Sequence, residues 1–227
     1  MNRYRLDRAH RDDNRKRMLL ALDTSGPLCS AALHDGSQVV ARQTDDIGRG
    51  HAEHLMGLLE GLLVSQNIDW SGITKIACTT GPGSFTGLRV GLATARGLAL
   101  ALKCPTIGVT VFEALRFKHT DPVAVVMDAR RNQIWMQVFD EGQTAPKAVS
   151  SDSFMDHIPR TCTRLIGSAA PLIVNHHPGF VIIDDAASPD IDAVACLAHL
   201  RGDRFEKLKP LYLRQADAKP QAAEAVN

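Results

Sequence analysis

The sequence predicts an α/β protein of two lobes, because the same arrangement of strands begins twice along the chain. A buried run that ends in an acid, "MLLALDTS" (18–25), precedes two strands separated by Asp-Gly at 35–36, which is a strong hairpin signal. After Asp-Pro at 121–122, "VAVVMDAR" and "NQIWMQVFDEG" repeat this arrangement around a turn at 130–132. Strands and helices alternate between the two starts, so each half is expected to hold a mixed sheet flanked by helices.

In the first half, residues 51–66 carry apolar side chains at helical spacing over a face too wide for one core contact to cover. Residues 75–80, "KIACTT", are expected to form a buried strand, and a glycine-rich loop joins it to a helix at 86–103. A strand at 105–110 and a short helix at 111–118 follow.

The second half has weaker patterns and is expected to form a reduced lobe. Short strands are predicted at 164–167 and 180–184, a helix at 190–201, and a strand or extended segment at 209–214. We place the two lobes at 18–104 and 105–214, after a disordered basic extension (1–17) and before a flexible tail (215–227). No sequence repeat between the halves is visible.

The charge is distributed unevenly along the chain. Residues 1–17 hold seven basic and three acidic residues, a net charge of +4, whereas the remainder holds 19 basic and 22 acidic residues, a net charge of −3. The body therefore gives no overall electrostatic indication of nucleic-acid binding. The extension lacks the apolar region of a secretory signal; it is a nucleic-acid-binding arm, a native extension, or the product of an upstream start codon, with Met18 as the natural first residue.

No apolar run approaches the ~18 residues that a membrane span requires, and no membrane association is expected. The five cysteines are an odd number, lie far apart and include no CxxC pair. They are expected to be reduced core residues of a cytoplasmic protein.

The glycine-rich loop "TTGPGSFTGLRVG" (79–91) fits neither common nucleotide motif. A Walker A loop requires Gly-Lys where Gly87-Leu88 stand, and a dinucleotide loop requires its third glycine one residue earlier. Two interpretations remain open: free N–H groups at the helix start bind an anion, or the glycines allow only a tight turn and close packing. The turn and cap residues are Gly81, Pro82, Gly83 and Ser84, with Ser84 as the N-cap.

Gly87, Gly91 and Ala95 recur every four residues and predict a strip of small residues along the second helix. Glycine within a helix costs about 1 kcal/mol relative to alanine, so another backbone is expected to approach closely. That neighbour is an internal element, a partner chain, or both.

Other polar residues raise possible ligand sites. His51 and His54 are three residues apart on a predicted helix, but the spacing differs from HExxH and indicates capping or partner contact rather than a metal site. Asp23, beside Thr24 and Ser25 at a strand end, could hold Mg²⁺ or a phosphate. Asp128 ends the corresponding strand of the second half, an arrangement that is similar to the plan of actin-like ATPases.

Four segments together carry a more specific resemblance. "LLALDTS", "GPGSFTGLRVG", "DARRNQIWMQVF" and "PLYLR", spread over residues 18–214, resemble the TsaB (YeaZ) family. Members of that family are the non-catalytic subunit of the bacterial tRNA threonylcarbamoyladenosine synthase. This sequence departs from the family where Asn132, Gln133, Ile134 and Trp135 replace Gly-Glu-Val-Tyr, which removes an acid at 133 and casts doubt on any polar contact made there.

The resemblance implies the ASKHA (actin-like, RNase H-like) fold and a place in a complex. The partners would be a catalytic TsaD-like subunit and a TsaE-like ATPase, with tRNA bound through the complex and a homodimer formed when the partner is absent. It implies no catalytic, cofactor-binding or metal-binding residue in this chain, since ATP and a metal ion would be used by the partner subunits.

The resemblance also implies that helices 51–66 and 86–103 form a helical bundle with the partner or with a second copy. The expected interface residues are His54, Leu55, Met56, Leu59, Leu62, Leu63, Gly87, Val90, Gly91, Thr94 and Leu98.

The alternative is a stand-alone ASKHA enzyme, either an ATPase or kinase, or a metal-dependent glycoprotease. The first would need a second phosphate loop, for which "LIGSAA" (165–170) is the only candidate, and the second would need a third metal ligand.

Overall fold

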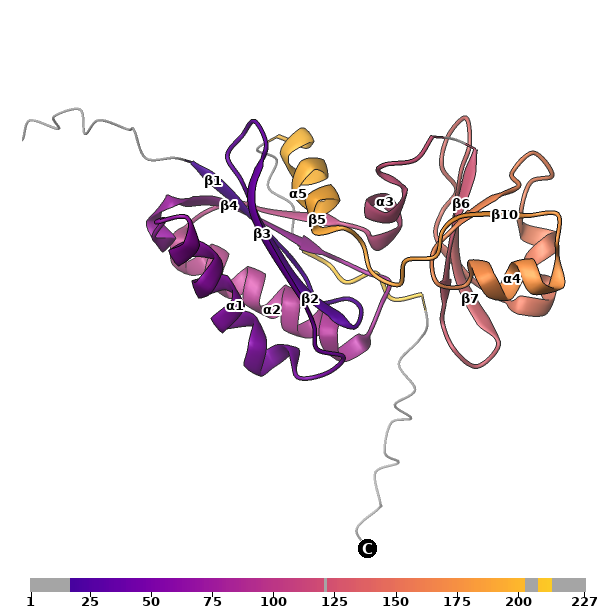
Figure 1. Cartoon of the computed structure of the whole chain (residues 1–227), viewed down its shortest axis with the longest axis horizontal. Helices are drawn as coiled ribbons and strands as arrows, with labels where there is room; N and C mark the ends of the chain where they lie inside the picture. Colours follow the sequence, from indigo (N-terminus) through magenta and orange to yellow (C-terminus); the bar gives the residue numbers. More distant parts are fainter. Residues whose placement is uncertain (1–16, 121, 203–207, 214–227) are drawn as a thin grey trace, which may run out of the picture.

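Two five-stranded sheets, one in each lobe, organise the chain (Figure 1). The computed structural model describes residues 17–120, 122–202 and 208–213. The predicted tail, and the predicted extension apart from Arg17, lie outside the described residues.

The first sheet has the order β3-β2-β1-β4-β5. Its strands are β1 (Met18–Asp23), β2 (Leu28–His34), β3 (Val39–Asp46), β4 (Ile73–Thr79) and β5 (Thr106–Val109). The first three pair antiparallel, as the Asp-Gly hairpin predicts, whereas β4 pairs parallel with β1 and β5 pairs parallel with β4. Both faces of β1 are buried, which explains its uninterrupted apolar run.

The second sheet, β8-β7-β6-β9-β10, repeats this order position for position. Its strands are β6 (Val123–Asp128), β7 (Gln133–Phe139), β8 (Lys147–Ser150), β9 (Arg164–Ile166) and β10 (Val181–Asp184). The antiparallel and parallel pairs also match those of the first sheet. The duplicated topology confirms the predicted two-lobed ASKHA fold, although the two halves show no visible sequence repeat.

Helices cover both faces of the first sheet. The helices α1 (His51–Ser65) and α2 (Phe85–Leu102) lie side by side on one face, and α5 (Ile191–Leu200) lies on the other (Figure 1). The expected boundary between residues 104 and 105 is therefore wrong, because β5 belongs to the first sheet and α5 returns to it from the second lobe. Sequence order alone does not reveal that return.

The second lobe carries less helix. Its sheet packs against α4 (Ala170–His176) and a 3-10 helix (Ser151–His157), whose Phe154 is fully buried. A second 3-10 helix lies at Trp70–Gly72, before β4, and α3 (Val111–Arg116) packs its apolar side chains against β6. The sequence analysis missed β8, α4 and both 3-10 helices, which are too short to show a clear period.

The small-residue strip of α2 faces this chain's own first strand. A Cβ atom added to Gly87 would lie 2.1 Å from the Thr24 carbonyl oxygen, and one added to Gly91 would lie 2.4 Å from the Thr24 hydroxyl oxygen. Ala95 is fully buried beside them. The sequence left open whether the backbone close to this strip belongs to the same chain or to a partner. It belongs to the same chain, so Gly87 and Gly91 are not partner contacts.

By length and composition alone, α2 is long and apolar enough to span a membrane. This differs from the expectation that no apolar run approaches the length of a membrane span. The helix lies against a sheet and two of the residues within it are arginines, Arg89 and Arg96. One side of α2 packs into the core of the first lobe, as the core helix of a folded α/β lobe does.

Gly87→Ala should lower the free energy of unfolding by about 1–3 kcal/mol, because the added methyl group meets the Thr24 backbone. Gly97→Ala, on the same helix with no heavy atom within 4 Å, should raise it by up to about 1 kcal/mol. Urea unfolding of both variants measures the two effects. Equal effects of the two substitutions would contradict the assignment of the strip to the core.

Candidate functional site

Hydrogen bonds of the glycine loop link the start of α2, the end of β1 and the start of α3. Ser84 is the N-cap of α2, as predicted, and its hydroxyl accepts a hydrogen bond from the Gly87 N–H (3.3 Å). The Ser84 N–H donates to the Ser25 carbonyl (2.7 Å), and the Gly81 carbonyl accepts from the Val111 N–H (2.8 Å). These bonds join the loop to the end of β1 and the start of α3. The loop therefore forms a tight, packed junction, and its glycines serve that packing.

Asp23 is completely buried where β1 ends. Its Oδ1 accepts hydrogen bonds from the Ser25 N–H (3.0 Å) and the Thr79 hydroxyl (2.5 Å), whereas Oδ2 has no hydrogen-bond partner among the described residues. Burial raises the pKa of the Asp23 carboxyl, although the hydrogen bonds from Ser25 and Thr79 oppose that shift. The Thr24 hydroxyl donates to the Gly87 carbonyl (2.8 Å). The predicted Asp23–Thr24 ligand pair thus makes internal contacts.

A pocket of about 450 Å³ lies between the lobes. Corresponding segments of the two halves meet there: the loops after β1 and β6, and the loops after β4 and β9. The polar and aromatic residues that line it include Ser25, Ser84, Asp128, Arg130, Trp135 and Ser168.

Most polar groups of this interlobe pocket are bound within the chain. Asp128 accepts from the Arg130 N–H (2.7 Å), and the Ser168 hydroxyl accepts from the Asp128 N–H (3.0 Å). Asp128 therefore occupies the position symmetric to Asp23, as its place in the sequence predicts, but its side chain is partly exposed. None of the described residues that line the pocket is a histidine or a cysteine.

The paired histidines do not converge on one site. His51 is buried and donates to the Leu28 carbonyl (3.2 Å), whereas His54 donates to the Asp45 carboxylate (2.6 Å). Within residues 17–120, 122–202 and 208–213, no group of three or more His, Cys, Asp or Glu side chains could hold a metal ion. The expectation that no metal binds stays a prediction.

Several expected interface residues belong to the core instead. Leu55, Leu59, Leu62 and Leu63 have at most 3% of their surface exposed and pack against the first sheet. The expectation that these leucines contact a partner is wrong, because the sheet and α2 together absorb the wide apolar face of α1. His54 and the α2 residues Val90, Thr94 and Leu98 are half-buried, and Met56 is 39% exposed.

Of the following residues, which these helices present to solvent, the sequence predicted only Met56 as an interface residue. We call them the outer face: Met56, Gly57 and Val64 of α1, with Ala93, Gly97 and Ala101 of α2. Val64 is 78% exposed, and Gly57 and Gly97 have no heavy atom within 4 Å of an added Cβ. The signal was available, since α2 has a third glycine outside the strip that we singled out.

Fold and surface together define a two-lobed ASKHA-type protein with a packed interlobe junction and an exposed helical pair. The model of the family described as "TsaD: tRNA N6-adenosine threonylcarbamoyltransferase" matches residues 38–169. The chain belongs to this group of proteins and, within it, to the TsaB (YeaZ) family.

The chain is similar to proteins of several bacteria. An uncharacterized protein of Mycobacterium tuberculosis is 32% identical over 208 residues, which cover 90% of this chain and 95% of that protein. The Escherichia coli "tRNA threonylcarbamoyladenosine biosynthesis protein TsaB" is 31% identical over 122 residues, 52% of each chain. The solved YeaZ from Pseudomonas aeruginosa shares the fold, with a TM-score of 0.71, 24% identity, and coverage of 86% of this chain and 99% of that one.

Asp23→Asn should remove a pH dependence of stability. Because burial raises the pKa of Asp23 above its unfolded value, its contribution is complete at acid pH and is lost as pH rises through the folded pKa. The variant should therefore gain stability relative to the wild type as pH increases, as measured by urea unfolding between pH 4 and 8.

The control, Asp35→Asn, should show the opposite trend, in urea unfolding measured between about pH 2 and pH 5, where the Asp35 carboxyl titrates. Hydrogen bonds from Ser37 and Gln38 lower the pKa of exposed Asp35 to about 2, so the wild type loses this contribution as pH falls. If Asp23→Asn has the same pH profile as the wild type, the Asp23 carboxyl does not carry the shifted pKa.

Proposed function

We propose that this chain is the non-catalytic subunit of a tRNA threonylcarbamoyladenosine synthase and docks a TsaD-like catalytic subunit on the outer face of α1 and α2. Membership of the TsaB family supports the biosynthetic role. The observation that carries the docking site is the pair of exposed helical glycines, Gly57 and Gly97, which this chain's own packing does not require.

The outer face suits an approaching helix. Each helical glycine costs about 1 kcal/mol relative to alanine. Among the described residues, no heavy atom from another part of the fold lies within 4 Å of a Cβ added at Gly57 or Gly97. Without a Cβ they leave room for a second backbone, and Ala93 and Ala101 extend that space along α2. Exposed Met56 and Val64 add apolar surface, while Glu53 and Glu60 provide charge beside it. Small and apolar residues with charged residues beside them are the composition expected of a protein–protein interface.

In this proposal the chain supplies a surface rather than chemistry. The partner subunits, TsaD-like and TsaE-like, use ATP and a metal ion, and tRNA is held by the whole complex. Without its partner, the outer face would pair with a second copy of the chain. The proposed location is the cytoplasm, where tRNA modification takes place.

A stand-alone ATPase or kinase draws its support from the interlobe pocket. Against it stands the loop after β9, where the single glycine, Gly167, is used for packing: an added Cβ would lie 2.3 Å from the Val126 carbonyl oxygen. ATP hydrolysis by the purified chain without partners would favour this alternative, and so would stoichiometric zinc for a glycoprotease.

Gly57→Glu and Gly97→Glu should each weaken binding to the TsaD-like protein of the same organism at least tenfold, because a charged side chain would fill the space left for the partner helix. The free chain should stay folded, since neither position has a neighbour within 4 Å. Isothermal titration calorimetry measures the affinity, and far-UV circular dichroism the fold.

The matched control is Gly179→Glu in the second lobe, a position equally free of neighbours, which should leave binding unchanged. Normal affinity of both helix variants would exclude the outer face as the docking site. A wild-type chain that binds no TsaD-like protein, and is dispensable for threonylcarbamoyladenosine formation by the remaining subunits, would refute the proposed function itself.

A further inference from the structure

One flank of α2 carries a row of cations. Arg89, Arg96 and Lys103 are the only charged residues between positions 85 and 103, and all three are exposed. Arg89 and Arg96 are seven residues apart, which is nearly two helical turns, so they lie on one side of the helix about 10.5 Å apart along its axis. Lys103 follows as the C-cap of the helix, where the backbone is left-handed. The net charge of the chain conceals this row, because it is local.

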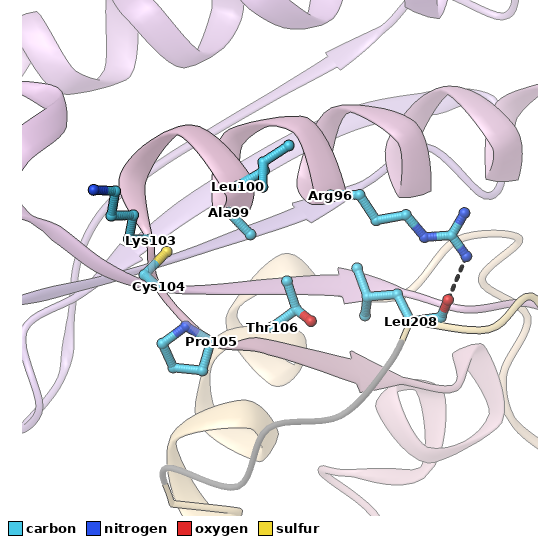
Figure 2. A pocket seen from close by; sticks show the side chains of 8 residues that line it. All are labelled: Arg96, Ala99, Leu100, Lys103, Cys104, Pro105, Thr106 and Leu208. Atoms are coloured by element: carbon cyan, nitrogen blue, oxygen red, sulfur yellow. Dashed lines mark hydrogen bonds between the residues drawn. The ribbon is translucent and has the colours of Figure 1, made fainter.

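The flank is the one beside residues 208–213, away from α1. The Arg96 guanidinium donates a hydrogen bond to the Leu208 carbonyl oxygen (Figure 2). Arg96 and Lys103 also line one pocket of about 580 Å³ with Leu100 and Leu208. Val90 and Leu98 pack on the core cluster that holds the α1 leucines. Ala93 of the outer face lies four residues after Arg89 and three before Arg96, so the cation row and the outer face are adjoining surfaces of α2.

An exposed aromatic pair lies at the first turn of the same flank. The rings of Phe85 and Tyr212 have centroids 5.4 Å apart, and each residue is 44% exposed. The Arg89 guanidinium carbon lies 3.8 Å from the Phe85 ring centroid. Two half-exposed aromatic rings beside a guanidinium offer planar surfaces on which another ring can stack.

The combination favours a polyanion that also carries rings. An acidic protein would neutralise Arg89, Arg96 and Lys103 but would leave the aromatic surfaces without a specific partner. RNA supplies both features: phosphates at intervals along a strand, and unpaired bases that stack on aromatic side chains.

We propose that the basic flank of α2 binds RNA directly, with phosphates held by Arg89, Arg96 and Lys103 and an unpaired base stacked on the Phe85–Tyr212 pair. The choice of tRNA as this RNA rests on the proposed function. The chain would then contribute to substrate binding as well as to assembly.

The first test measures binding of the full-length chain to a fluorescently labelled, unmodified tRNA transcript by anisotropy at several salt concentrations. Three cations on a single strand predict a slope of log K against log salt of about −2 for this flank. Arg89→Ala combined with Lys103→Ala should make the measured slope shallower by about 1.4. Arg96 stays unchanged because it bonds the backbone at Leu208.

The matched control is Arg49→Ala combined with Arg160→Ala, which removes two exposed arginines elsewhere. It should leave the slope unchanged. The arginine-rich residues 1–17 are present in every variant, so their contribution cancels in the comparison.

The second test separates stacking from charge. Tyr212→Ala should weaken tRNA binding roughly 5- to 150-fold, whereas Tyr212→Phe should retain it, because only the ring is required. Polyglutamate, an anion without rings, should bind with the same affinity to the wild type and to Tyr212→Ala.

Several outcomes would overturn the proposal. These are an unchanged salt slope in the Arg89/Lys103 variant, an equal loss in the Arg49/Arg160 control, or an equal effect of Tyr212→Ala on polyglutamate and tRNA. Titration of the same variants with the TsaD-like protein keeps the two proposals distinct, since the flank variants should retain partner affinity. A wild-type chain that binds the TsaD-like protein but no tRNA refutes the flank alone, and absence of partner binding in the wild type refutes the docking role.

Discussion

The contact between the end of β1 and the first turns of α2 is the constraint on which the rest of the structure depends. Thr24 approaches so closely that no side chain fits at Gly87, and its hydroxyl closes the contact by donating to the Gly87 carbonyl. The Ser84 cap and its bond to Ser25 fix the same junction from the loop side. Because α2 is held this tightly against the sheet, its remaining sides are presented in a defined orientation.

That orientation gives one helix three roles. The side formed by Gly87, Gly91 and Ala95 packs on the first sheet. The side toward α1 exposes Gly97 and Ala101 as part of the proposed docking face, and the adjoining flank carries the cation row from Arg89 to Lys103. A partner protein and an RNA strand could thus occupy α2 together, on adjoining surfaces. In that arrangement the rigid β1–α2 junction relates the two binding surfaces.

The duplicated topology explains the shape of the interlobe pocket. Corresponding strand ends of the two sheets bring Ser25 and Ser84 from one lobe opposite Asp128 and Ser168 from the other. Asp23 and Asp128 occupy equivalent positions yet have different environments, the first fully buried and the second partly exposed. Internal hydrogen bonds engage Asp128 and Ser168, in keeping with the proposed scaffold role.

The sequence by itself determined the two-lobed fold, the family, the Ser84 cap and nearly all of the longer elements. The fold, the cap and the longer elements depend on local pattern, such as apolar runs, the Asp-Gly hairpin and the glycine loop before a helix. The family rests on the resemblance of four segments to known members. Only the tertiary structure decided which side of each helix is buried. It shows that Leu55, Leu59 and the Gly87–Gly91 strip are buried in the core and that α5 packs on the first sheet. It also shows that Tyr212 lies beside Phe85. Periodicity shows that a helix has a small or apolar face, but which neighbour covers that face depends on contacts between residues far apart in the chain.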